Sequence, residues 1–335
     1  MKARLAAVDY YQPATVLDNI ELESEHPEWK IGRLSKVTGI TTRHVAGPDE
    51  FSSDLATAAG KALFSTAGIA PTDVDYLIVC TQTPDYFLPT TACLVQDALG
   101  LRKDVGAIDI TLGCSGYIYS IGLAKGLIES GQVRNVLIIT VETFTKLANQ
   151  ADRTTRSIFG DGAAATWVVG NAETEAIGGI SLGTDGGGGP ALVVPNGGIR
   201  NDALYSPAAA VDLRDLESNG YDMYMDGLEI FNFTLRVVPE TVERVLSATG
   251  LAVEQVDLFI FHQANAYLIE HLRKKLEIPS EKFVVALDGF GNTASSTIPI
   301  ALARAIADKR VKKGDRIMLV GFGVGLSWGG LVLTW

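Results

Sequence analysis

Short apolar runs rich in β-branched residues alternate along the chain with longer amphipathic stretches. The runs predict buried strands and the longer stretches predict helices. The strands are expected at 76–80, 107–110, 135–140, 164–169, 258–261 and 317–321, and helices at 53–66, 115–130, 266–276 and 297–308. Strands that alternate with helices in this way predict an α/β fold.

The hydrophobic pattern also repeats within the chain. Residues 68–78 resemble residues 250–260, and 134–138 resemble 316–320, both 182 positions later. Residues 123–125 resemble 302–304 at a spacing of 179. Chance similarity between ordinary α/β segments is one interpretation. Three matches in the same order favour two halves of one topology, which we place at residues 1–172 and 173–335.

This repeat brings three polar residues into equivalent places. Cys114 aligns with Thr293, so Cys114 and Asn292 occupy corresponding strand-to-helix turns, and His262 directly follows the strand at 258–261. Sites in α/β sheets gather beyond the carboxyl ends of the strands. We therefore expect side chains from both halves to meet in one cleft.

Cys114 has the sequence context of a nucleophile. Gly113 permits a tight turn after a strand, and a helix is expected to begin near Ser115. Partial positive charge at a helix N-terminus lowers a thiol pKa and favours the reactive thiolate. The alternative is a small buried cysteine, the role that we expect for Cys80 and Cys93.

His262 and Asn292 have the chemistry to assist such a thiol. A neutral imidazole donates a hydrogen bond to a thioester carbonyl or accepts a proton as a base. The Asn292 amide carries two N–H groups that could stabilise an enolate oxygen without titrating. A structural histidine at a strand end and an asparagine turn are the alternatives.

A glycine-rich segment near the C-terminus predicts backbone donors rather than a phosphate loop. Residues 321–325 follow a strand but lead into another β-like run, whereas a dinucleotide fingerprint requires a helix there. Their N–H groups could form half of an oxyanion hole.

Composition limits the remaining possibilities. The 335 residues include 47% hydrophobic and 20% charged residues, as in globular proteins, and no apolar run approaches the ~20 residues of a membrane span. A net charge of -11 disfavours nucleic acid as a partner. Three unevenly spaced cysteines favour a reducing cytoplasm, and without CxxC or HExxH motifs no metal site is expected.

Several segments together resemble the β-ketoacyl-acyl-carrier-protein synthase III family of the thiolase superfamily. The resemblance spans nearly the whole chain, and its motifs lie at residues 37–40, 43–44, 112–116, 159–163, 262–265, 291–293, 322–325 and 328–329. Each motif alone is modest evidence for this family, but the full set of motifs in this order is specific to it. The resemblance implies homodimers of five-layered αβαβα subunits with a Cys-His-Asn site.

The resemblance also implies a two-stage reaction without a permanently bound cofactor. Cys114 would accept an acyl group from acyl-CoA, and a malonyl-acyl-carrier protein would then enter. His262 and Asn292 would stabilise the enolate left by loss of carbon dioxide, which attacks the acyl group. The oxyanion would lie on the backbone N–H groups of Cys114 and Val324, while Phe322 shields the site.

The contacts that this family makes with CoA are altered here. Typical members clamp the CoA adenine between a tryptophan and an arginine, and Val37 stands where that arginine is expected, at an unusual spacing from Trp29. Thr38, Arg153 and Asn265 match the remaining CoA and pantetheine contacts. These departures leave open whether the donor is CoA or a carrier protein.

The acyl pocket and the protein-docking surface follow the same comparison. Leu88 stands where a bulky aromatic often closes the acyl pocket across the dimer interface, which indicates room for more than acetyl. The alternative is that the adjacent Phe87 takes the place of that aromatic. A basic stretch matches a patch that docks acyl carrier protein, although a solvated helix face explains it equally; its residues are Arg273, Lys274 and Lys275.

Three other functions compete with condensation. An acyltransferase that uses an alcohol or amine without decarboxylation often lacks the asparagine or the histidine, and both are present here. A papain-like hydrolase would have a different signature around its cysteine. A non-catalytic partner subunit would normally have lost Cys114.

Overall fold

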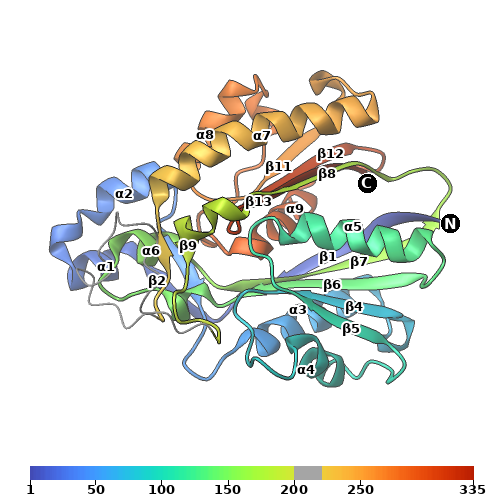
Figure 1. Cartoon of the computed structure of the whole chain (residues 1–335), viewed down its shortest axis with the longest axis horizontal. Helices are drawn as coiled ribbons and strands as arrows, with labels where there is room; N and C mark the ends of the chain where they lie inside the picture. Colours follow the sequence, from blue (N-terminus) through green and yellow to red (C-terminus); the bar gives the residue numbers. More distant parts are fainter. Residues whose placement is uncertain (200–220) are drawn as a thin grey trace.

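The computed structural model describes residues 1–199 and 221–335 and contains two main β-sheets (Figure 1). The first has five strands in the order β1-β7-β6-β4-β5. Strand β4 is parallel to β5 and β6, while β7 is antiparallel to β6 and β1. Their bounds are Lys2–Tyr11 (β1), Tyr76–Cys80 (β4), Gly106–Ile110 (β5), Asn135–Glu142 (β6) and Gly162–Ala172 (β7).

The second sheet repeats this pattern in the order β11-β12-β13-β8. Strand β11 is parallel to β12, which is antiparallel to β13, and β13 is antiparallel to β8. The bounds are Ile177–Thr184 (β8), Leu258–Phe261 (β11), Arg316–Gly323 (β12) and Ser327–Thr334 (β13). The two sheets are thus built on one plan, although the boundary at 172/173 stays a prediction.

One pair of carboxylates shows the repeat at the level of single hydrogen bonds. Asp75, before β4, accepts from the backbone N–H of Asn135 at 3.0 Å. Asp257, before β11, accepts from the backbone N–H of Arg316 at 2.8 Å. Each aspartate joins the start of the strand that follows it to the start of the neighbouring parallel strand.

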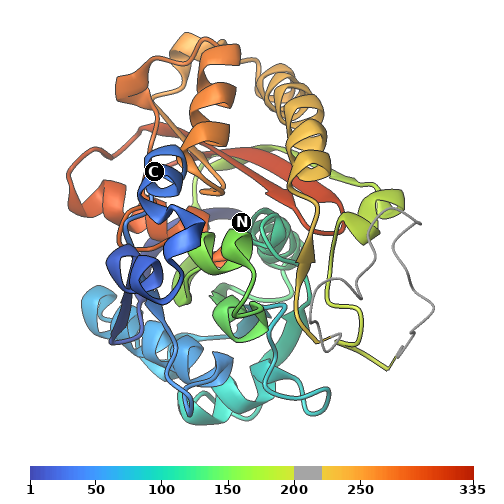
Figure 2. The ribbon, with the colours of Figure 1, turned by 90° about the vertical axis from the view of Figure 1, so that its left-hand side faces the viewer.

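Helices form three layers around the two sheets (Figures 1 and 2). Helices α5 and α9 lie between the sheets, α3 and α4 cover the first sheet, and α7 and α8 cover the second. Their bounds are Ser52–Ala67 (α3), Thr91–Ala98 (α4), Gly116–Glu129 (α5), Gly227–Thr249 (α7), Ala266–Lys275 (α8) and Thr297–Ala307 (α9). The chain therefore has the five-layered αβαβα arrangement.

Smaller elements lie beside the ends of the sheets. Two hairpin-like pairs are formed by β2 (Thr15–Asp18) with β3 (Thr42–Val45), and by β9 (Leu192–Val193) with β10 (Tyr224–Met225). Three short helices accompany them: α1 (Asn19–Glu25), α2 (Ile31–Thr38) and α6 (Arg153–Ile158). None of the helices in the described ranges combines the length and the hydropathy needed to cross a bilayer.

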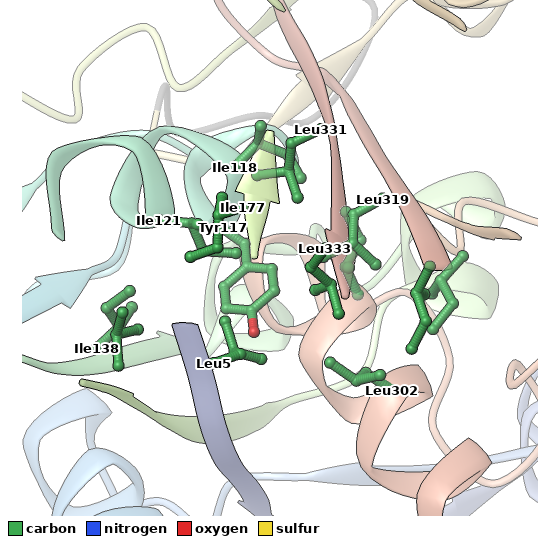
Figure 3. Close-up of a cluster of buried hydrophobic side chains, with 14 of the residues drawn as sticks. Leu5, Tyr117, Ile118, Ile121, Ile138, Ile177, Leu302, Leu319, Leu331 and Leu333 are labelled. Carbon is green, nitrogen blue, oxygen red and sulfur yellow. The ribbon is translucent and has the colours of Figure 1, made fainter. Parts of the chain in front are cut away.

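The main core lies between the sheets (Figure 3). Side chains alternate across each strand, so Val136 and Ile138 of β6 face α5 and α9, whereas Leu137 and Ile139 face α3 and α4. Tyr117 is fully buried among these residues and its hydroxyl lies 3.0 Å from that of Thr166. This packing fixes the depth at which α5 begins.

The predicted strands and helices are all present, with ends shifted by a few residues. Strands β1 and β8 were not predicted, because their residues are mostly half-buried and lack a continuous apolar run. In the glycine-rich stretch 183–189, β8 continues to Thr184 and a 3-10 turn spans Gly186–Ala191.

Candidate active site

Cys114, His262 and Asn292 line one cavity of about 240 Å³. The three come from three different chain segments, after β5, after β11 and before α9. The remaining lining is mostly apolar: Thr154, Ile158, Phe159, Leu192, Met225, Gly227, Ile230, Phe231, Ala264, Asn265, Leu268, Phe322 and Gly323. Among the described residues, no lysine or arginine lines this cavity, and none of their side chains forms a cluster suited to a metal ion.

Close backbone packing holds Cys114 at the start of α5. A Cβ on Gly116 would lie 2.3 Å from the sulfur of Cys80, and one on Gly321 of β12 would lie 2.7 Å from the Cys114 carbonyl oxygen. Side chains at these positions would therefore displace the turn. The glycines set the sulfur at the cavity floor, where Cys114 is 6% exposed.

The expected lowering of the Cys114 pKa is wrong for the free site. Burial, and to a smaller extent the nearby Glu142 carboxylate, raise the pKa of this thiol to about 12. The backbone N–H groups of Cys114 and Val324 act in the opposite direction by hydrogen bonding to the sulfur. The helix terminus is present, but loss of hydration outweighs its partial charge.

His262 is a neutral base held by a hydroxyl. Burial lowers its pKa to about 3, so the imidazole is uncharged at neutral pH. Its Nδ1 lies 2.7 Å from the Thr297 hydroxyl, which also lies 3.0 Å from the Ala294 carbonyl. The single Thr297 proton is donated either to the Ala294 carbonyl or to Nδ1. When it is donated to Nδ1, the imidazole proton is on Nε2, the nitrogen available to a substrate.

Asn292 has a fixed amide orientation. Its backbone N–H donates to the Ile158 carbonyl at 2.8 Å, and its side-chain oxygen accepts from the Ala294 N–H at 2.9 Å. Ala294 has a left-handed φ of 44°, which is unusual without glycine. Because the amide oxygen is occupied, the amide nitrogen is left to donate into the cavity.

Aromatic rings shape the space above the sulfur. Phe322 is 1% exposed and packs edge-on against the His262 ring at 5.4 Å. Phe159 lines the cavity and stacks on Phe144 at 5.3 Å. These rings exclude water and provide no charged partner for an entering group.

The residues predicted to contact CoA lie at different depths. Asn265 lines the cavity and caps α8 through its side-chain oxygen, which accepts from the Leu268 N–H at 2.9 Å. Thr38 is buried and donates to the Leu34 carbonyl. Arg153 donates to the Trp29 carbonyl at 3.3 Å.

Trp29 is not open to a flat ligand in this structure. It is 8% exposed, and the His26 ring stacks on it at 3.8 Å with an angle of 4° between the planes. Val37, at the position of the usual arginine, is 51% exposed.

The predicted docking residues are largely engaged within the chain itself. Arg273 donates to both carboxylate oxygens of Glu270 at 2.7 Å and to the Ile278 carbonyl. Lys275 donates to the Leu235 carbonyl at 2.9 Å. Lys274 is 69% exposed and 3.4 Å from Glu270, so it has the most exposed charge of the three.

The two residues predicted at the acyl gate lie outside the cavity of this single chain. Phe87 is 73% exposed and Leu88 is 85% exposed, on the loop before α4. Both side chains are thus largely uncovered by the described residues.

Sequence reasoning missed two buried residues near the nucleophile. Thr297 was assigned only to a helix, and Glu142 falls just beyond the predicted strand at 135–140. An acid that ends a run of buried residues is an unusual pattern, and it could have singled out Glu142. Nothing in the sequence pattern distinguishes Thr297 from other threonines.

Known protein families match both the sequence and this geometry. The model of 3-oxoacyl-[acyl-carrier-protein] synthase III matches residues 108–186, and the model of its C-terminal region matches residues 246–335. A β-ketoacyl-[acyl-carrier-protein] synthase III from Caldanaerobacter subterraneus is 41% identical over 329 residues, covering 97% of this chain and 95% of that protein. The chain belongs to the 3-oxoacyl-[acyl-carrier-protein] synthase III family.

Two further matches agree with this membership. A synthase III of Clostridium perfringens is 39% identical, covering 99% of this chain and 98% of that protein. A crystal structure of a 3-oxoacyl-(acyl-carrier-protein) synthase III has a TM-score of 0.95 and 41% identity, with full coverage of both chains. The thiolase-like fold predicted from the motifs is confirmed, and the chain is a condensing acyltransferase of this family.

Proposed function

We propose that this synthase III moves an acyl group from acyl-CoA to Cys114 and joins it to a malonyl group carried by acyl carrier protein. The products are a 3-oxoacyl-carrier protein, carbon dioxide and CoA. One observation carries the proposal: a thiol and two uncharged hydrogen-bonding side chains, His262 and Asn292, share an apolar cavity.

The first half-reaction needs a thiolate and an oxyanion site. The sulfur of Cys114 attacks the acyl carbonyl carbon, the bond to the CoA sulfur breaks, and the thiol proton leaves with CoA. The N–H groups of Cys114 and Val324 already face this sulfur. After acylation they are placed to donate to the carbonyl oxygen of the thioester.

The second half-reaction uses the uncharged donors. Nε2 of His262 and the amide nitrogen of Asn292 donate to the malonyl thioester carbonyl. The bond to the carboxylate breaks, its electron pair forms the enolate, and carbon dioxide leaves. The enolate carbon then attacks the acyl group on Cys114, whose sulfur departs. The described residues that line the cavity include no lysine or arginine, so they give the carboxylate no cation that would oppose its loss.

Substrate delivery follows from residues around the cavity. We assign pantetheine contacts to Asn265 and nearby Thr38, and a CoA contact to Arg153. Docking of acyl carrier protein is assigned to the end of α8, where Lys274 has the most exposed charge; Arg273 and Lys275 complete the predicted patch. Acyl carrier protein and acyl-CoA are then substrates, and the compartment is the cytoplasm.

A homodimer completes this picture. Strand β5 is an edge of the first sheet, and an unpaired edge favours pairing with another chain. The exposed Phe87 and Leu88 lie on the loop after the neighbouring strand β4. In a dimer formed along this edge, Phe87 and Leu88 would reach the acyl cavity of the partner.

Mass spectrometry of the intact protein tests the function directly. Incubation with a panel of acyl-CoAs should add one acyl group to the wild-type chain and none to Cys114→Ala. Cys93→Ala is the matched control. The expectation that Cys93 is buried was wrong, and this exposed cysteine should not alter the adduct. Addition of malonyl-acyl-carrier protein should then release carbon dioxide.

Two results would reject parts of this proposal. An acyl adduct that persists in Cys114→Ala removes the nucleophile. An acylated Cys114 that releases no carbon dioxide with malonyl-acyl-carrier protein shifts the assignment to acyl transfer without decarboxylation.

A further inference from the structure

Glu142 is a fully buried acid that the proposed reaction leaves unused. It ends β6, where side chains alternate, so it lies on the same face as Thr140, between the two sheets. The Thr140 hydroxyl accepts from Ser296 at 3.0 Å. The carboxyl of Glu142 therefore lies where both halves meet. Gln82, whose backbone N–H donates to this carboxyl, has its side-chain oxygen packed against Gly113, the residue before Cys114.

The hydrogen bonds of Glu142 are one-sided. Oε2 accepts from the backbone N–H of Gln82 at 3.0 Å and from the Thr83 hydroxyl at 3.1 Å, with Thr81 at 3.5 Å. The Ser295 hydroxyl is also adjacent, yet neither it nor Oε1 makes a hydrogen bond of normal geometry. A buried carboxyl with one unpaired oxygen is costly to ionise.

The charges around Glu142 do not compensate it. Within residues 1–199 and 221–335, no lysine, arginine or histidine forms an ion pair with it. The ionisable groups that face it are two thiols, Cys80 from β4 and Cys114 from the turn before α5. The groups contributed by the loop after β4 and by the turn at Ala294–Ser296 are hydroxyls and one amide.

The electrostatic consequence has a definite sign. Burial raises the pKa of Glu142 to about 8, against the weaker effect of its hydrogen bonds. As a carboxylate it raises the pKa of Cys114. As a neutral acid it exerts no such repulsion. The pKa of the Cys114 thiol is therefore lower when Glu142 is neutral than when Glu142 is ionised.

We propose that Glu142 is a positioning residue whose protonation state controls how readily Cys114 becomes a thiolate. The proposal rests on the proposed function only in taking Cys114 as the nucleophile. Neutral Glu142 permits acylation near neutral pH, whereas ionised Glu142 restrains the thiol in alkaline solution.

Alkylation of Cys114 by iodoacetamide, followed from about pH 6 to pH 10 by peptide mass spectrometry, tests this without any acyl substrate. Glu142→Gln should match the wild-type rate below about pH 7 and exceed it about tenfold near pH 9, the effect of one pKa unit. Asp161→Asn is the matched control. Asp161 is also fully buried, but its two oxygens accept from Ala46 and Thr145, and it should leave the profile unchanged.

Three results would overturn the proposal. In the first, wild type and Glu142→Gln are alkylated at the same rate at pH 9. In the second, their rates differ by the same factor at every pH. In the third, Asp161→Asn changes the rate profile as much as Glu142→Gln does. If Glu142→Gln does not fold, the wild-type profile decides alone. If Cys114 is coupled to Glu142, the alkylation rate of the wild type must rise by clearly less than tenfold per pH unit around pH 8. A rate that rises tenfold with every pH unit contradicts the coupling. Failure of Cys114 to take an acyl group would reject the function separately.

Discussion

Burial determines the ionisation of both titratable side chains that line the cavity. It raises the pKa of Cys114 to about 12 and lowers that of His262 to about 3. A helix terminus contributes ~0.3–1 kcal/mol, whereas full burial shifts a pKa by several units. At neutral pH the free site therefore holds a thiol and a neutral imidazole rather than an ion pair, and substrate binding must supply the stabilisation of the thiolate.

The Thr297 hydroxyl is the hydrogen-bond partner that holds Nδ1 of His262. Thr297→Val removes this partner, so the imidazole loses its fixed orientation and Nε2 is no longer held in place to donate to the malonyl carbonyl. We expect decarboxylation by the acylated enzyme to slow by ~10–100-fold, while acylation of Cys114 changes much less. The two half-reactions are measured separately, by carbon dioxide release and by intact mass.

Thr297→Ser is the control for this effect, because it retains the hydroxyl at the same depth. It should restore most of the decarboxylation rate. Equal loss in both half-reactions, or no rescue by serine, would assign Thr297 a packing role instead. The ¹⁵N shifts of the His262 ring provide a direct measure of the tautomer.

At the scale of elements, tight packing at the start of α5 is what places the nucleophile. The first residue of this helix, Gly116, packs on β4, and Gly321 of β12 packs on the same turn. Strands from both sheets thus fix one helix end. The depth of the sulfur follows from the backbone rather than from the cysteine itself.

Two alanine substitutions on α5 test this difference. Gly116→Ala places a Cβ 2.3 Å from the Cys80 sulfur, so we expect a loss of ~1–3 kcal/mol in unfolding free energy and about tenfold slower acylation. Gly126→Ala meets nothing within 4 Å and should stabilise by ~0.5–1 kcal/mol. Urea unfolding and intact mass measure both. Similar effects from the two variants would contradict the packing argument.

At the scale of the whole molecule, an exposed apolar loop lies near an unpaired sheet edge. Tyr86, Phe87 and Leu88 are 61%, 73% and 85% exposed, and Ile108 of the edge strand β5 is 36% exposed. Apolar side chains gathered at one edge are typical of a protein interface. This arrangement supports the proposed homodimer. It also explains why Phe87 and Leu88 do not line the acyl cavity of their own chain.

A charge on this loop should separate the subunits. For Leu88→Asp we expect a shift from dimer to monomer in sedimentation velocity, together with a changed preference among acyl-CoAs of different length. Ile20→Asp is the matched control, since Ile20 is 77% exposed on the distant helix α1 and should leave the dimer intact. A monomeric wild-type chain, or a Leu88→Asp dimer with unchanged preference, would contradict the role of this loop.

The sequence by itself determined most of the strands and helices and their repetition, but not the strands β1 and β8. Strand β4 and strand β11 were predicted to the residue, since continuous apolar runs between turns are a local signal. The family followed from motifs in a fixed order, and the spacing predicted that Cys114 and Asn292 occupy corresponding turns. These features depend on neighbours in the chain, so they can be read without a fold.

Only the tertiary structure decided the state of the groups in the cavity. The pKa of Cys114 is raised, whereas the sequence predicted that it is lowered. Thr297 lies beside His262 and Glu142 lies near Cys114. Burial and these contacts come from different chain segments, which in some cases lie more than a hundred residues apart. Trp29 likewise proved covered by His26. Hydration is lost through packing of distant elements, and no local pattern in the sequence records how much is lost.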